Sequence, residues 1–266
     1  LKKVLIALFA FMMAQGVVWY TTFFYAAIFL EKTVKLDAAT VNYLTMLMTL
    51  LSAPLYVLWA ALSDRIGRKV VMVSGIAIAV VAFIPGFHLM ARFANPALDA
   101  AITKNPVVIF ADLRECTVQF DPVGKAQFTT PCDLAKGLVT GLGVPYESRT
   151  SEPGATAATV QIGTEMIAIR SARGLEADEV RVLKLQATNQ LKDALIKAGD
   201  PARADPAQAN LWGVFAVLMV FAIGATALYG PMAAMLVEMF PTNVRYTAMS
   251  LPYNIGTGWF GGLLPA

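Results

Sequence analysis

The chain has 266 residues, of which 57% are hydrophobic and 15% charged, and its mean hydropathy is +0.60. This composition is too apolar for an ordinary soluble domain and indicates a membrane protein. The segment 92–205 is nearly neutral, with 13 basic and 14 acidic residues, so the net charge of +3 comes from short loops elsewhere. Charge spread in this way gives no support to nucleic-acid binding.

Five long apolar stretches predict membrane-spanning helices. The stretch 4–30 contains no charged residue over 27 positions, and about 20 apolar residues cross a bilayer core. Four similar stretches follow, at 38–63, 70–90, 211–237 and 246–266. A buried core helix is the alternative for any one of them, but five in one chain favour a membrane domain. The sequence begins without Met, shows no signal-peptide pattern and ends inside an apolar stretch, so we expect a piece of a longer protein.

Lysine and arginine in the short loops predict the orientation of these helices. If the spans alternate, one side carries six basic residues: Lys2, Lys3, Arg65, Arg68, Lys69 and Arg245. The short loop on the opposite side, 31–37, balances two lysines with two acidic residues. We therefore expect the first side to be cytoplasmic. The long segment between the third and fourth spans is then expected outside the membrane on the other side.

That segment, 95–210, is typical of a small soluble α+β domain inserted between membrane helices of residues 1–94 and 211–266. A short apolar stretch predicts a strand at 107–111. The other expected elements are a hairpin of 116–120 and 126–130 around the turn 121–125, a strand at 158–170, an amphipathic helix at 176–198 ending at Gly199, and a linker at 201–208.

The sequence contains two cysteines, Cys116 and Cys132, and both lie in this inserted segment. In a hairpin centred on Gly124 they would stand opposite one another. A disulfide between them would close a 17-residue loop, which stabilises a fold by about 3 kcal/mol in the chain-entropy model. An oxidising outer compartment permits such a bond. The alternative is a pair of free thiols.

A short polar turn, 63–69, separates the second and third apolar stretches, and four of its seven residues are charged. Asp64 would end a helix, where the helix dipole disfavours an anion, so a nearby cation should hold it. Gly67 permits a tight turn. The turn resembles the D-R-x-G-R-K loop of the major facilitator superfamily, although Ala60 stands where glycine is usual in that family. A loop that only obeys the positive-inside rule is the alternative interpretation.

A second motif, 238–250, places Glu238 at the end of the fourth span and Arg245 at the start of the next. With 229–231 before it and 251–256 after it, it resembles the metabolite:proton symporter branch of the same superfamily. The resemblance covers the five spans and implies helices seven to eleven of a twelve-helix fold. The expected fold is therefore an all-α membrane protein, the C-terminal half of a transporter, with a small α+β domain inserted that is not part of the family pattern.

This resemblance implies a cytoplasmic charge cluster that latches the two halves of such transporters when the inner side is closed. Its expected members are Asp64, Arg65, Gly67, Arg68, Lys69, Glu238 and Arg245. Exposed ion pairs are worth only about 0–1 kcal/mol each, but several can bias a two-state equilibrium. The alternative is that these charges only set the topology.

Polar and aromatic residues inside the spans are the candidates for a substrate cavity, because polar side chains are costly against lipid. They are Gln15, Trp19, Tyr20, Asn42, Tyr43, Tyr229, Tyr253 and Asn254, with Thr22 and Tyr25 as further members. Hydrogen bonding between helices or an aromatic belt is the alternative for each. His88 is the sole histidine and has no partner at metal-ligand spacing, so we expect neither a metal site nor a cofactor.

The expected function is proton-coupled symport of a small organic acid or zwitterion, of the dicarboxylate, shikimate or betaine type, across a bacterial inner membrane by alternating access. The coupling carboxylate would lie in a missing N-terminal half, because no acidic residue lies deep in a span. A facilitator, or a membrane-anchored periplasmic receptor, is the alternative. An enzyme is not expected, since no nucleophile–base pair or phosphate loop is apparent.

Overall fold

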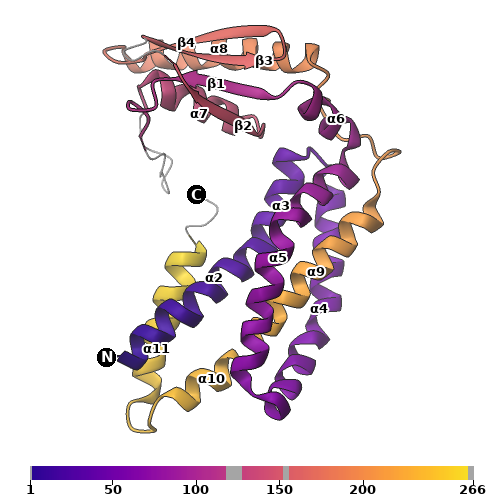
Figure 1. Ribbon diagram of the computed structural model, residues 1–266, viewed down its shortest axis with the longest axis vertical. Helices are drawn as coiled ribbons and strands as arrows, with labels where there is room; N and C mark the ends of the chain where they lie inside the picture. Colours follow the sequence, from indigo (N-terminus) through magenta and orange to yellow (C-terminus); the bar gives the residue numbers. More distant parts are fainter. Residues whose placement is uncertain (1, 118–127, 152–155, 263–266) are drawn as a thin grey trace. The chain divides into compact units, whose positions relative to one another are not determined.

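The computed structural model describes residues 2–117, 128–151 and 156–262. The chain divides into two compact units (Figure 1). The helical unit consists of 1–31, 36–94 and 210–266, and the inserted unit consists of 32–35 and 95–209.

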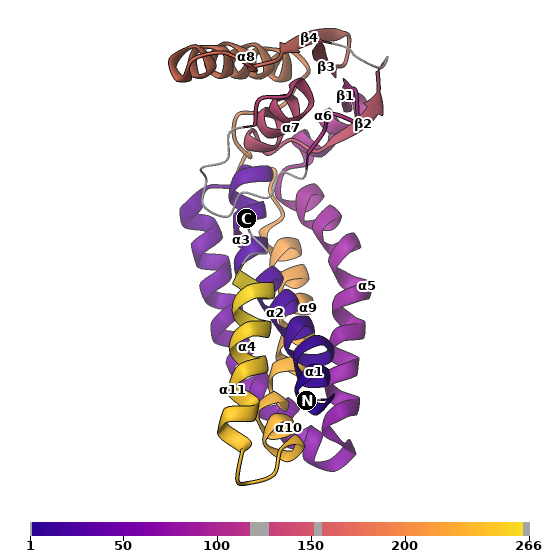
Figure 2. The ribbon, with the colours of Figure 1, turned by 90° about the vertical axis from the view of Figure 1, so that its left-hand side faces the viewer.

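Four helices of the helical unit are long and apolar enough to cross a membrane, as four of the five predicted spans require. They are Lys3–Thr33, Ala38–Ile66, Arg68–Ala94 and Leu211–Met239. The second and third are the single helices α4 (Ala38–Ile66) and α5 (Arg68–Ala94), and the fourth joins α9 (Leu211–Tyr229) to α10 (Met232–Met239) across Gly230 and Pro231. In Figures 1 and 2, α4, α5 and α9 run side by side.

The first span alternates between α-helical and π-helical turns. Its α-helical parts are α1 (Lys2–Ile6), α2 (Met13–Tyr20) and α3 (Ala26–Ile28), and its π-helical parts are η1 (Ala7–Met12), η2 (Thr21–Tyr25) and η3 (Phe29–Thr33). Short π-helical turns inside helices are frequent at functional sites.

The predicted fifth span is helical over α11 (Arg245–Ile255) and η4 (Gly256–Gly261). It is not among the four membrane-length helices of the described chain, and residues 263–266 lie outside the described residues. The fifth span therefore stays a prediction.

Glycines allow the spans of the helical unit to approach one another closely. A Cβ atom on Gly75 of α5 would lie 2.7 Å from the Gly224 carbonyl oxygen and from the Leu228 amide nitrogen of α9. A Cβ atom on Gly16 of α2 would lie 3.0 Å from the Gly256 carbonyl oxygen. Because lipid gives apolar helices no hydrophobic reason to associate, such backbone contact is a main source of packing energy in a bilayer.

The inserted unit contains a mixed four-stranded sheet. Its helices are α6 (Pro96–Lys104), α7 (Pro131–Gly141) and α8 (Ala177–Lys197), and its strands are β1 (Val107–Ala111), β2 (Tyr146–Thr150), β3 (Ala157–Ile162) and β4 (Glu165–Arg170). The strand order is β2-β1-β3-β4. β1 pairs in parallel with β2 and antiparallel with β3, which pairs antiparallel with β4.

One face of this sheet and the helices α7 and α8 enclose the core of the inserted unit. Alternate residues of β1, β3 and β4 point into this core, as the period of two in a strand requires, and Ile109 at the centre of β1 has no exposed surface. From the helices, Leu134 and Leu191 are also buried against it. One side of α8 is buried in this core and the other is exposed, which explains the amphipathic pattern of its sequence.

The structure confirms the predicted strand at β1 and the predicted helix at α8, whose start is a capping box and whose end is followed by Gly199 at φ +90°. The predicted single strand 158–170 is wrong. It is the hairpin of β3 and β4, because Gly163 turns the chain at φ +58°. Sequence reasoning did not predict α6, α7 or β2.

The predicted hairpin at 116–130 has no strand in its described ends. Cys116 and Thr117 lie in a loop, and Thr130 is the N-cap of α7. The part of this hairpin at 118–127 lies outside the described residues.

The loop after the first span belongs to the inserted unit, which binds it through Lys35. The Lys35 ammonium lies 2.7 Å from both carboxylate oxygens of Asp200 and donates to the Pro201 carbonyl at 3.2 Å. The exposed fractions of the Lys35 and Asp200 side chains are 19% and 8%. Asn95, itself buried, donates to the Val34 carbonyl at 3.0 Å. This loop is therefore part of the packed structure of the unit.

Replacing Lys35 with Met is expected to lower the free energy of unfolding of the inserted unit by about 1–3 kcal/mol, because the carboxylate of Asp200 would remain nearly buried without its cation. Thermal unfolding followed by circular dichroism measures this loss. Lys192→Met, at an exposed position of α8, is the matched control and should change stability by less than about 0.5 kcal/mol. Equal effects of the two variants would contradict the structural role of the Lys35–Asp200 pair.

Candidate functional site

A charge cluster joins the turn between the second and third spans to the end of the fourth. Arg68 at the start of α5 lies 3.0 Å from the carboxylate of Glu238 in α10 and 3.4 Å from that of Asp64 in α4. The Arg68 side chain is 23% exposed, whereas those of Asp64 and Glu238 are 67% and 60% exposed. One guanidinium thus holds two carboxylates from two different parts of the chain.

Two further cations bind the carbonyl groups that end α10. Lys3 donates from Nζ to the Met239 carbonyl at 3.1 Å, and Arg245 donates from Nε to the Phe240 carbonyl at 3.2 Å. The last carbonyl groups of a helix lack partners within the helix and carry partial negative charge, so cations are favourable there. Lys3 was expected only to mark the cytoplasmic side.

The predicted cluster is therefore brought together in part. Asp64, Arg68 and Glu238 meet through ion pairs, and Arg245 lies at the same end of α10. Gly67, at φ +97°, makes the turn that places Arg68 next to Asp64. Among the described residues, Arg65 and Lys69 form no ion pair, and both are exposed.

An open groove of about 740 Å³ runs between the first and second spans. Its lining residues are Trp19, Phe23, Phe24, Asn42, Thr45, Met46, Thr49, Leu50, Ser52, Ala53 and Tyr56. One wall is aromatic, and the other is a polar strip on α4. None of these residues carries a formal charge. The groove can therefore take a small molecule with an apolar face and hydrogen-bonding groups.

Trp19 organises the aromatic wall of the groove. Its indole Nε1 donates to the Tyr56 hydroxyl at 3.3 Å, and its ring centre lies 5.3 Å from that of Phe23. The Tyr56 ring also meets the Tyr229 ring edge to face, with ring centres 5.7 Å apart. Tyr229 and Tyr253 share a hydrogen bond of 3.3 Å between their hydroxyl groups. Aromatic side chains of four helices thus form one connected cluster.

Gln15 and Thr22 are almost fully buried polar residues of the first span. The Gln15 Oε1 accepts a hydrogen bond from the Thr257 hydroxyl at 3.0 Å. The Gln15 amide nitrogen and the Thr22 hydroxyl have no hydrogen-bond partner in the described part of the chain. Buried polar groups normally have partners, so these two atoms are exceptions in the packing of the first span.

The other cavity candidates lie apart from the groove or at its edge. Tyr20 stacks on Phe24, with ring centres 5.3 Å apart. Tyr43 is 69% exposed on α4. Asn254 donates to the Ser250 carbonyl at 2.8 Å and lines a separate hollow on α11. Tyr25 packs edge to face on Phe87. Of the predicted set, Trp19 and Asn42 line the groove directly.

Sequence reasoning missed Tyr56, because it considered polar residues span by span and Tyr56 lies towards the charged end of α4. The hydroxyl groups of Thr45 and Ser52, which also line the groove, bond to carbonyl groups of their own helix at 3.0 Å and 2.9 Å. Their spacing of seven residues places them on one face of α4, and this pattern could have identified the polar strip.

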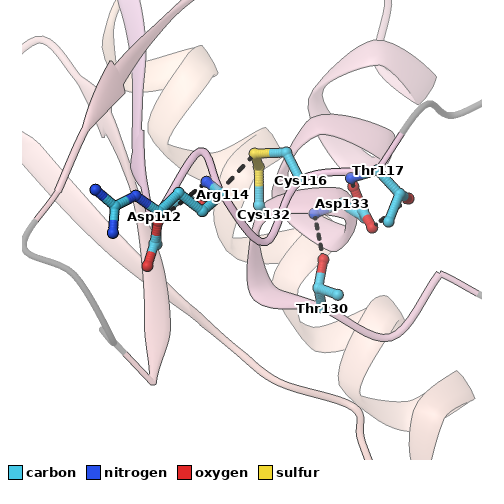
Figure 3. The surroundings of a disulfide bond; sticks show 7 residues. All are labelled: Asp112, Arg114, Cys116, Thr117, Thr130, Cys132 and Asp133. Carbon is cyan, nitrogen blue, oxygen red and sulfur yellow. Dashed lines mark hydrogen bonds between the residues drawn. A yellow bond between two sulfur atoms is a disulfide. The ribbon is translucent and has the colours of Figure 1, made fainter.

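The predicted disulfide between Cys116 and Cys132 is confirmed (Figure 3). The two Cα atoms lie 5.3 Å apart. The bond joins the loop after β1 to the first turn of α7, and not two strands of a hairpin. In the described part of the chain, no group of three His, Cys, Asp or Glu side chains is arranged to hold a metal ion.

Comparison with known proteins gives one short similarity. Over 44 residues the chain is 48% identical to a Haemophilus influenzae protein named "Putative metabolite transport protein". The aligned stretch is 16% of this chain and 10% of that protein. No family model matches the chain, and no solved structure matches it. The similarity is therefore confined to a short stretch of a chain that has four helices long and apolar enough to cross a membrane.

The hydrogen bond between Trp19 and Tyr56 is expected to hold the first span against the second. Trp19→Phe and Tyr56→Phe should each lower stability, and a double-mutant cycle in thermal unfolding should give a coupling energy of about 0.5–1.5 kcal/mol. Trp212→Phe is the control, because Trp212 is 79% exposed and should show no coupling to Tyr56. A coupling energy near zero between Trp19 and Tyr56 would contradict the bond.

Proposed function

We propose that the chain is the C-terminal half of a secondary transporter of the major facilitator type, in the metabolite:proton symporter branch, and that it moves a small organic acid or zwitterion across a bacterial inner membrane. The observation that carries this proposal is the pair of bonds from Arg68 to Asp64 and Glu238. These bonds join the two sequence motifs that resemble that branch. The similarity to a metabolite transport protein supports the same conclusion.

The charge cluster acts as a latch at the cytoplasmic side in this proposal. Asp64 and Glu238 are largely exposed, so each pair contributes only about 0–1 kcal/mol. A state change in a transporter needs a bias of a few kcal/mol, so the two pairs of Arg68 would act together with pairs to the other half of the transporter. Weak pairs are suited to the task, because a latch that opens in every cycle cannot be held by strong bonds.

The groove between the first and second spans forms part of the substrate path. Its wall of Trp19 and Tyr56 offers aromatic faces, and Asn42 offers an amide for hydrogen bonding. The remaining walls of the path would come from the other half of such a transporter. The coupling carboxylate belongs to that other half, since none of the groove residues is acidic.

A transport assay tests the proposal directly. Cells that express a full-length transporter containing this chain would be given labelled α-ketoglutarate, citrate, shikimate, proline and betaine, with and without a protonophore. Uptake of one compound that collapses with the protonophore is the expected result. Uptake that survives the protonophore would indicate a facilitator, and no uptake of any compound would favour a receptor role for the inserted unit.

Arg68→Gln should lower that uptake at least about tenfold while changing the free energy of unfolding by less than about 1 kcal/mol, because exposed pairs add little to stability. Lys69→Gln is the matched control, since the adjacent Lys69 forms no ion pair among the described residues. It should transport like the parent. If both variants transport equally well, the proposal of a latch is wrong. If Arg68→Gln unfolds the protein, the ion pairs of Arg68 stabilise the fold and do not act as a latch.

A further inference from the structure

The two cysteines of the Cys116–Cys132 disulfide differ in their secondary structure and in their exposure (Figure 3). Cys132 is the second residue of the 11-residue helix α7, next to Pro131 and the N-cap Thr130, and only 1% of it is exposed. Cys116 lies five residues after the end of β1, and it is partly exposed. Of the two residues, Cys116 is therefore the one that an external thiol reaches more readily.

The position of Cys132 makes it the better leaving group. Attack on Cys116 would release Cys132 as a thiolate inside the first turn of α7. Amide groups at a helix N-terminus stabilise a thiolate, and a disulfide opens faster when its leaving thiolate is stabilised. The more exposed cysteine and the cysteine in the first turn of α7 are thus two different residues, as directed exchange requires.

A second connection holds the same two segments together beside the disulfide. The carboxylate of Asp133 accepts hydrogen bonds from the Thr117 amide at 2.9 Å and from the Thr117 hydroxyl at 2.7 Å. Asp133 is 2% exposed, and its own amide donates to the Thr130 hydroxyl at 3.1 Å. Thr117 directly follows Cys116 in the sequence, and Asp133 directly follows Cys132. The two segments are therefore cross-linked twice.

This double connection is expected to keep the two cysteines near one another even when the disulfide is open. The bonds between Thr117 and Asp133 do not depend on the sulfur atoms, so the two thiols should stay close together. Groups held together in this way react at a high effective concentration. The disulfide should re-form rapidly without refolding of the unit, and a bond needed only for stability would gain little from such a clamp.

We propose that Cys116 and Cys132 form a reversible thiol–disulfide exchange site for an external dithiol. One thiolate of the dithiol attacks the sulfur of Cys116, the Cys116–Cys132 bond breaks, and Cys132 leaves with the electron pair and takes up a proton. The second thiol of the dithiol then attacks the mixed disulfide and releases Cys116. The dithiol is oxidised to a disulfide, and the two cysteines are reduced to thiols. This activity is independent of transport.

Chemical trapping on the purified full chain tests which sulfur is attacked. The Cys132→Ser variant leaves Cys116 free, and Cys116→Ser leaves Cys132 free. Each would be incubated with oxidised glutathione in native buffer, and the mixed disulfide would be measured by mass spectrometry. Cys132→Ser is expected to form it at least about tenfold faster, because its free sulfur is the accessible one. Equal rates, or reaction of either variant only after denaturant is added, would overturn the proposal.

A variant that keeps both cysteines tests the clamp. The parent chain is expected to be reduced by dithiothreitol in native buffer, to keep its circular dichroism spectrum, and to re-form the disulfide after the reductant is removed. Asp133→Asn weakens the bonds to Thr117, so it should re-form the disulfide about tenfold more slowly. Asp178→Asn, on the exposed first turn of α8, should behave like the parent. A disulfide that resists dithiothreitol until the chain unfolds would show a purely structural bond.

Discussion

The lack of water in the hydrocarbon core of a bilayer is the constraint on which the helical unit depends. Every backbone amide and carbonyl group there must bond within the protein, and a helix does this within one segment. The same constraint turns polar side chains away from lipid. Gln15 bonds to Thr257, and Thr45 and Ser52 bond to their own helix. In the described part of this unit, the Gln15 amide nitrogen is one of the few buried polar atoms without a hydrogen-bond partner.

Backbone contact and aromatic packing replace the hydrophobic effect as the means of holding these helices together. Gly75 and Gly224 bring α5 and α9 close enough for backbone atoms to touch. Trp19, Tyr56 and Tyr229 connect three spans through their rings and one hydrogen bond. The charges are confined to the helix ends, where Arg68 binds two carboxylates. The interior is fixed by shape, and the ends carry exposed ion pairs that add little to stability.

The inserted unit follows the ordinary physics of a water-soluble domain. It buries one face of a sheet under two helices, and it adds a disulfide and a buried ion pair at its margins. Of its polar anchors, Lys35 binds Asp200 and the Pro201 carbonyl, and the Asp133 carboxylate accepts two hydrogen bonds from Thr117.

The sequence alone predicted the four helices of membrane-spanning length, the charged turn and the amphipathic helix α8, because uninterrupted apolar length and a 3.6-residue period are local properties of a chain. It also identified the two cysteines as a pair. The turn at Gly163 and the start of α7 at Pro131 are local features that the sequence analysis did not predict. Only the tertiary structure decided that Tyr56 and not Tyr43 faces Trp19, because this contact depends on which distant segments meet, and a one-dimensional pattern does not contain that information.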